Sequence, residues 1–167
     1  MHVKKLFCIV FLIFCGLTVS ADNNISIINT FAGLLGKPEN IVSDYINSTF
    51  NTMSPYIFEQ DGDKIAVTYK LTFYDEECTL EQEYYPELFY NRFIFSNPDN
   101  SDRLYKRLLI DLNSLFNEAV IYENGSLISY YWETGQTFQI HAYVMLDIEF
   151  NSAGTAAKIS LIISYGA

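Results

Sequence analysis

The sequence predicts an α+β fold in which an N-terminal helical hairpin and a central amphipathic helix pack on antiparallel β-sheet. Three observations predict it. Apolar residues recur at helical spacing near the start of the chain and again over residues 101–116. Apolar and polar residues alternate over 64–74 and 137–150, which is typical of strands with one buried face. Turn sequences such as Asp61-Gly62-Asp63 and Asn124-Gly125 separate neighbouring strands.

Residues 1–21 are predicted to be a cleavable secretory signal. Lys4 and Lys5 precede an unbroken apolar run, Leu6–Cys15, and Val19-Ser20-Ala21 places short side chains at a cleavage point. The apolar stretch is shorter than the roughly 20 residues that a helix needs to cross a bilayer, so no permanent transmembrane anchor is expected. We therefore expect export to the periplasm, the envelope or the medium.

The cysteines fit this interpretation. Acylation of Cys15 is disfavoured because Phe14 stands where lipoprotein processing usually requires a small side chain. Cys8 and Cys15 leave with the signal, so Cys78 remains without a disulfide partner. We interpret Cys78 as a partly buried structural residue rather than a nucleophile.

The charge of the chain limits its partners. Removing residues 1–21 takes away two lysines and no acid, so the net charge changes from −10 to −12. Such a domain repels phosphate backbones and anionic membranes, which argues against a nucleic-acid partner. A basic protein would be steered toward it.

From residue 22 onward the chain is predicted to be a single domain, 22–167, that begins with two helices. The first carries an apolar stripe and ends at Gly36, and the second begins at Pro38. A third helix over 101–116 has leucines on one face and must lie on an apolar surface.

Eight strands are expected between and after these helices. The acidic Asp75-Glu76-Glu77 segment is interpreted as a solvated loop, and the last four strands as an antiparallel meander with a type I′ turn at Asn124-Gly125. One face of this sheet should be covered and the other solvated. The expected strands are residues 56–58, 64–74, 79–85, 88–95, 119–123, 127–133, 137–150 and 157–165.

Residues 22–95 and 99–167 therefore share one order, helix followed by four strands. No residue-level repeat accompanies it, so internal duplication is a hypothesis about architecture. The order, with the Leu35-Gly36-Lys37-Pro38 turn, resembles exported inhibitors of the β-lactamase-inhibitor type, which have tandem helix-plus-four-strand units. It also resembles small outer-membrane assembly proteins with one such unit. The resemblance is one of architecture and implies an exported, protein-binding domain.

Catalytic motifs are absent from the sequence. It has no G-x-S-x-G, H-E-x-x-H, Gly-rich phosphate loop or C-x-x-C. His141 is the only histidine after residue 21, which excludes multi-histidine metal sites. No cofactor or metal is expected, and a non-enzymatic role is favoured. A general-base role for His141 is left open.

Two alternative functions remain at this stage. The carboxylates around Asp61, Asp75 and Glu81 could form the acid pair of a hydrolase that acts on envelope glycan. A small-ligand carrier would need an apolar cavity between helices and sheet.

Aromatic residues give the leading hypothesis, because the chain contains 13 tyrosines. Tyr130-Tyr131-Trp132 lies on a predicted strand, where consecutive side chains point to opposite faces. At least one must face solvent, and exposed Tyr and Trp on a rigid sheet are favoured binding anchors. We therefore predict a binding face on the sheet for another, basic protein. Its expected residues are Tyr130, Tyr131, Trp132, His141 and Tyr143.

Overall fold

A computed structural model of the chain describes residues 23–50, 57–134 and 142–165. Within them the protein has three helices and one eight-stranded antiparallel sheet, so the predicted α+β class is confirmed. The predicted signal, residues 1–21, lies outside the described residues. None of the helices in the described segments has the length and apolarity needed to span a bilayer.

The sheet consists of two four-strand meanders joined edge to edge, in the order β1-β2-β3-β4-β8-β7-β6-β5. The last strand of each meander, β4 and β8, lies at the junction, and Phe93 pairs there with Leu161. In chain order the strands are β1 (Ile57–Asp61), β2 (Lys64–Phe73), β3 (Glu76–Tyr84), β4 (Leu88–Ser96), β5 (Val120–Asn124), β6 (Leu127–Glu133), β7 (Ala142–Phe150) and β8 (Ala156–Tyr165).

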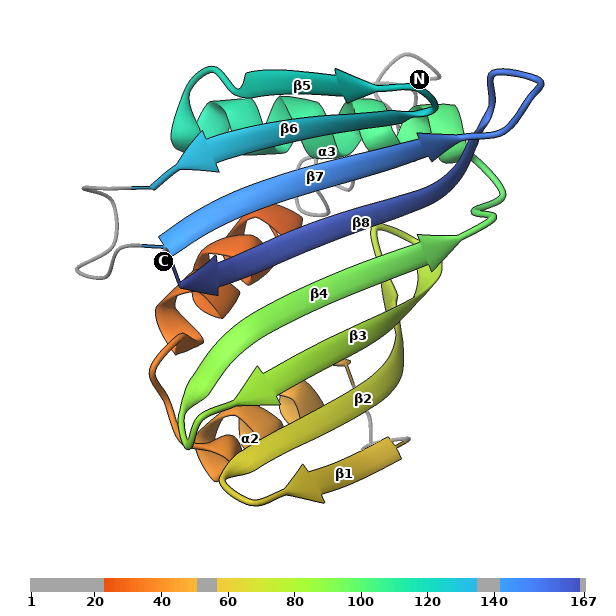
Figure 1. The fold of residues 1–167 in the computed structure, drawn as a ribbon. Helices are drawn as coiled ribbons and strands as arrows, with labels where there is room; N and C mark the ends of the chain where they lie inside the picture. Colours follow the sequence, from red (N-terminus) through yellow and green to blue (C-terminus); the bar gives the residue numbers. More distant parts are fainter. Residues whose placement is uncertain (1–22, 51–56, 135–141, 166–167) are drawn as a thin grey trace, which may run out of the picture.

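Helices precede each meander and lie on the same face of the sheet (Figure 1). The helix over residues 23–34 and α2 (Glu39–Phe50) precede β1, and α3 (Ser101–Phe116) precedes β5. The expected order of helix followed by four strands thus occurs twice. Internal duplication is a hypothesis for the origin of this repeated order. The face that the helices leave uncovered is called the open face below.

The first helical hairpin turns at Gly36. Its φ of 76° is a left-handed conformation that favours glycine, and a Cβ at this position would collide with the Tyr165 hydroxyl. The Gly36 N–H donates to the Leu88 carbonyl at 2.9 Å. The turn is therefore fixed against the ends of β4 and β8.

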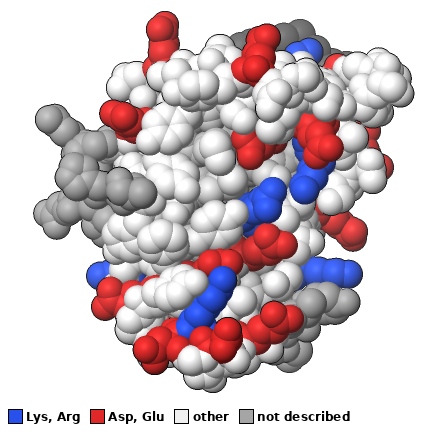
Figure 2. Space-filling model, viewed as in Figure 1, with Lys and Arg blue, Asp and Glu red and all other residues white. Residues whose placement is uncertain are grey.

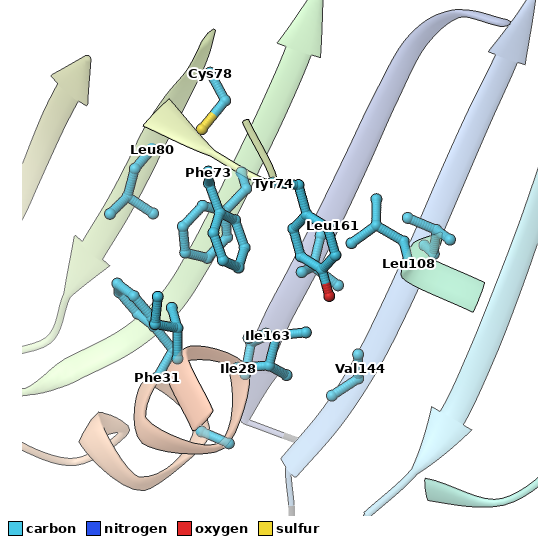
Figure 3. Packing of buried hydrophobic residues seen from close by; sticks show 14 of the residues in the cluster. Ile28, Phe31, Phe73, Tyr74, Cys78, Leu80, Leu108, Val144, Leu161 and Ile163 are labelled. Atoms are coloured by element: carbon cyan, nitrogen blue, oxygen red, sulfur yellow. The ribbon is translucent and has the colours of Figure 1, made fainter. Parts of the chain in front are cut away.

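The core lies between the helices and the sheet (Figure 3). Phe31 packs edge to face on Phe93 with ring centroids 4.8 Å apart, and Phe73 lies 4.9 Å from the same ring. Leu108 of α3 and Leu161 of β8 are fully buried in the same cluster. Because aromatic pairs in this geometry add to area burial, Phe93 is a centre of the core.

The predicted solvated loop Asp75-Glu76-Glu77 is shorter than expected, because Glu76 and Glu77 begin β3, although Asp75 and Glu77 are exposed as predicted. Tyr74 and Asp75 have φ values of 57° and 65° and form a tight turn from β2 directly into β3. Phe73 and Glu76 pair across it. Two consecutive positive φ values allow this tight reversal without glycine, although non-glycine residues there are strained.

This turn contacts α3 from the other half of the chain. Glu76 accepts hydrogen bonds from the Asp99 and Asn100 N–H groups at 3.2 and 3.3 Å, just before the helix begins. Asp75 forms an ion pair with Arg107 at 3.3 Å. A carboxylate at this end favours a helix electrostatically.

The turn between β5 and β6 also differs from the prediction. Asn124 and Leu127 pair, which leaves Gly125 and Ser126 as the two loop residues. Gly125 has a φ of 62° and Ser126 does not have a positive φ. A type I′ turn requires positive φ at both central residues, so the expected type I′ turn centred on Asn124-Gly125 was wrong.

Candidate functional site

Each strand divides its side chains between the helix-covered face and the open face. Along β2, the buried residues Val67, Tyr69 and Leu71 alternate with Thr68 and Lys70, which are more exposed. The same alternation continues through β7, where Val144 and Leu146 are buried. Strand register then identifies which residues of different strands lie together on the open face.

Four tyrosines from four strands form a diagonal line across the open face, here called the tyrosine row. It consists of Tyr90 of β4, Tyr143 of β7, Tyr131 of β6 and Tyr122 of β5. The rings of Tyr131 and Tyr143 stack at 5.8 Å between centroids, with 28° between their planes. Tyr122 is 61% exposed, and the other three are partly buried. The row therefore presents amphipathic rings on a rigid support.

Shorter side chains of β8 lie between the long side chains of β4 and β7 on the open face. Ser164 pairs with both Tyr90 and Tyr143 and is almost fully buried, although it belongs to the open face. Ile162, between Arg92 and Met145, is also buried. The side chains on β4 and β7 thus cover β8 from both sides. This packing restricts the rotamers of the β4 and β7 side chains before any partner binds.

Two tyrosines of the row, Tyr131 and Tyr90, have raised pKa values. Burial, followed by the nearby Glu133 charge, raises the pKa of Tyr131. Burial also raises the pKa of Tyr90, despite the opposing effect of Arg92. These two hydroxyls therefore stay protonated at neutral pH, and each can both donate and accept a hydrogen bond at the rim of an otherwise apolar surface.

Acidic groups outnumber basic groups on the open face. Figure 2 shows an uncharged area on this face with charged groups on its borders. Lys64 and Glu83 form an ion pair at 3.1 Å, whereas the ion pair between Arg92 and Glu81 is longer, at 3.9 Å. The open-face acids are Glu59, Asp61, Glu77, Glu81, Glu83, Glu133, Asp147 and Glu149, and the open-face bases are Lys64, Lys70, Arg92 and Lys158.

Arg92 stands close to the centre of the open face with incomplete pairing. One of its terminal nitrogens lies 3.5 Å from the Ser160 hydroxyl. Its buried Nε has no hydrogen-bond partner among the described residues. Arginine is frequent at protein interfaces, and an incompletely paired guanidinium next to tyrosines suits that role.

Of the five predicted binding residues, the structure brings Tyr131 and Tyr143 together on the open face. Trp132 and Tyr130 lie on the other face, so the expectation that Trp132 is an exposed anchor was wrong. Trp132 is 1% exposed, and its Nε1 donates to Asn113 Oδ1 of α3 at 3.0 Å. It is a core residue because α3 covers this side of β6.

His141 lies outside the described residues, as do residues 137–140 of the predicted long strand. The open-face residues that the predicted binding site did not include are Tyr90, Tyr122, Arg92 and Met145. Tyr122 lies in β5, where all residues are exposed and no burial alternation is visible. Arg92 lies beside β8, and so near Met145, only because β4 pairs with β8, and these two strands are far apart in the sequence.

An open groove of about 370 Å³ lies at one end of the open face, between β2, β3 and β4. Polar groups dominate it, and among its lining residues Glu77 is the one carboxylate. Glycoside hydrolysis uses two carboxylates. The groove therefore gives no support to the hydrolase alternative, and it is not an apolar cavity of the kind a carrier needs.

Cys78 is a free, buried cysteine. Burial raises the pKa of the Cys78 thiol, which keeps it protonated and unreactive. No cluster of three or more His, Cys, Asp or Glu side chains that could hold a metal ion occurs among the described residues.

Comparison with protein families, with curated proteins and with solved structures finds no match to this chain. Its resemblance to tandem-unit inhibitors therefore remains one of element order. The candidate site stands on geometry alone.

Proposed function

We propose that this chain is an exported, non-enzymatic binding module that holds a basic protein partner against the open face of its sheet, with an inhibitory or accessory role. The single observation that carries the proposal is the tyrosine row. Four tyrosines from β4, β7, β6 and β5 converge on one uncovered face, and two of them stack. Tyrosine is enriched among residues that dominate binding energy at protein interfaces.

The support beneath the row suits a binding role. Tyr90, Tyr131 and Tyr143 project from strands that are paired on both sides. Their side chains are partly buried by their neighbours, so little conformational entropy is lost when a partner packs on them. A preorganised surface of this kind binds without rearrangement of the backbone.

Charge argues for a basic partner. The chain has a net charge of −10, and acidic groups outnumber basic groups on the open face. Complementary potentials increase the rate of association and exclude acidic competitors. The association rate should therefore fall as salt concentration rises.

The proposal is tested by capture from extracts of the source organism with immobilised 22–167, which contains every described element. The double variant Tyr131→Ala/Tyr143→Ala should lose a basic protein that the wild-type chain retains. Tyr85→Ala is the matched control, because Tyr85 is 51% exposed but lies outside the row. Capture of the same protein by wild type and double variant alike would contradict the proposal.

A further inference from the structure

Strand β5 is an edge of the sheet that carries one carboxylate, Glu123, and no charge on the open face. Within the described part of the chain it pairs with β6 on one side and with no strand on the other. All of its residues are exposed, and its first three are large and hydrophobic. Val120, Ile121 and Tyr122 are 54%, 54% and 61% exposed. Edge strands are normally protected by charge, proline or a bulge, because their unpaired backbone groups attract other strands.

The opposite edge, β1, provides a comparison within the same molecule. Both edge strands have five residues, and each leads into a two-residue turn with a positive φ at Gly62 or Gly125. Charges distinguish them. On the open face β1 carries Glu59 and Asp61, where β5 carries Tyr122 and Asn124. One edge is thus protected by carboxylates, and the other continues the tyrosine row to the rim.

The hydrogen-bonding pattern identifies which backbone groups of β5 face outward. Asn124 and Leu127 close a two-residue hairpin, so they form a hydrogen-bonded pair, and Tyr122 with Ser129 forms the next. Residues between these pairs direct their N–H and C=O groups away from β6. The outward groups are therefore those of Ile121 and Glu123, two residues apart, as strand addition requires.

Charge identifies the occupant. A second copy would bring another net charge of −10 to an edge that already carries Glu123, so self-pairing is opposed by repulsion. An extended segment of another protein avoids this when it is apolar at alternate positions and basic at its ends. Its alternate residues would pack beside Val120 and Tyr122, and its basic groups would approach Glu123.

We propose that an extended, basic segment of a partner protein pairs with β5 as a ninth strand of the sheet. This inference rests on the proposed function and specifies how the partner is held. The segment makes main-chain hydrogen bonds to Ile121 and Glu123, which give affinity with little sequence requirement. Contacts with Tyr122 and the rest of the tyrosine row then select the partner.

The probe is a synthetic peptide that alternates valine and threonine between terminal lysines, with blocked ends. Amide hydrogen exchange is followed by NMR at millimolar peptide. Exchange at Ile121 and Glu123 should slow by about tenfold or more, while that at Phe58 and Gln60 of β1 stays unchanged. The same peptide with glutamates in place of its lysines should have no effect. Unchanged exchange with the lysine peptide, or equal slowing by both peptides, overturns the proposal.

Two variants separate the edge from the rest of the face. Ile121→Pro removes an outward N–H and leaves the bonds to β6, and should abolish slowing at Glu123. Phe58→Pro is the matched change in β1 and should have no effect. Ile121→Lys protects the edge by charge and serves if the proline variant unfolds. A chain that is already dimeric, with Ile121 and Glu123 protected before peptide is added, shows that a second copy occupies the edge and overturns the proposal.

These outcomes are distinguishable from failure of the proposed function. If Tyr131→Ala/Tyr143→Ala loses the captured protein while Ile121→Pro retains it, the tyrosine row binds the partner and strand addition is wrong. If both variants retain it, the proposed function fails as well.

Discussion

The Tyr74 hydroxyl donates a hydrogen bond of 2.6 Å to Asp111 Oδ2, which joins the β2–β3 turn of the first half to α3 of the second. Arg107 lies over the Tyr74 ring at 5.2 Å and pairs with Asp75. These contacts compensate for the strained positive φ at Tyr74 and Asp75. The β2–β3 turn therefore connects the two halves of the chain on the helix-covered side of the sheet.

The contribution of this bond can be measured against another buried tyrosine. Tyr74→Phe removes a donor to a carboxylate and should lower the free energy of unfolding by about 1.5–3 kcal/mol. Tyr69 is also buried, but its hydroxyl has no partner among the described residues. Tyr69→Phe should therefore leave stability unchanged or raise it by up to about 1 kcal/mol. Urea unfolding of both variants decides, and equal losses would contradict the assignment.

Alkaline pH should destabilise the fold through its buried tyrosines. Burial, followed by Glu39, raises the pKa of Tyr69 to about 12, from an ordinary value of 10.0. As the pH rises, the Tyr69 hydroxyl therefore loses its proton in the unfolded chain before it does so in the folded chain. The free energy of unfolding should be unaffected below about pH 10 and should fall between pH 10 and pH 12. The expected slope is about 1.4 kcal/mol per pH unit. Tyrosinate absorbance should rise together with loss of circular dichroism. Full ionisation of a chain that stays folded would be inconsistent with this.

Gly36 should be less tolerant of substitution than Gly154, which has the same φ of 76° but open space around its Cα. Gly154→Ala should cost about 1–2 kcal/mol of stability from the backbone alone. Gly36→Ala should cost more, because its Cβ meets the Tyr165 hydroxyl. In a Tyr165→Ala background, Gly36→Ala should cost about as much stability as Gly154→Ala does in the wild-type chain. Equal losses at the two glycines would show that the contact with Tyr165 is not limiting.

Trp132 and Tyr131 should behave in opposite ways although they are adjacent. Trp132→Ala empties a fully buried site and should destabilise the domain by about 3–5 kcal/mol. Tyr131→Ala removes a partly exposed ring and should cost about 1 kcal/mol or less. Thermal unfolding followed by circular dichroism tests both. A mild effect of Trp132→Ala would place that residue back on the surface.

The sequence predicted the elements well where burial follows a local period. The third helix occupies 101–116 as expected, and the alternation over 64–74 corresponds to β2. Pairing of β4 with β8 was not predictable, because it joins strands from opposite halves of the chain. The β2–β3 connection was expected as a longer loop, because Tyr74 is not a usual turn residue and its positive φ depends on contacts with α3.

The candidate site was predictable only in part. Tyr130, Tyr131 and Trp132 had to alternate between faces, but the sequence does not say which face α3 covers. Asn113 of that helix meets Trp132, so Tyr131 faces outward. The sequence did not identify Tyr122, because all residues of the short edge strand β5 are exposed and show no alternation of buried and exposed positions.

Binding of a protein partner to the open face, from the tyrosine row to β5, can be measured residue by residue. It is tested most directly by titrating the captured partner, unlabelled, into ¹⁵N-labelled 22–167 and mapping the amide shifts. Perturbations are expected at Tyr90, Tyr143, Tyr131 and Tyr122 and their neighbours on β4 to β8. Shifts confined to α2 and α3, with the tyrosine row unchanged, would contradict it.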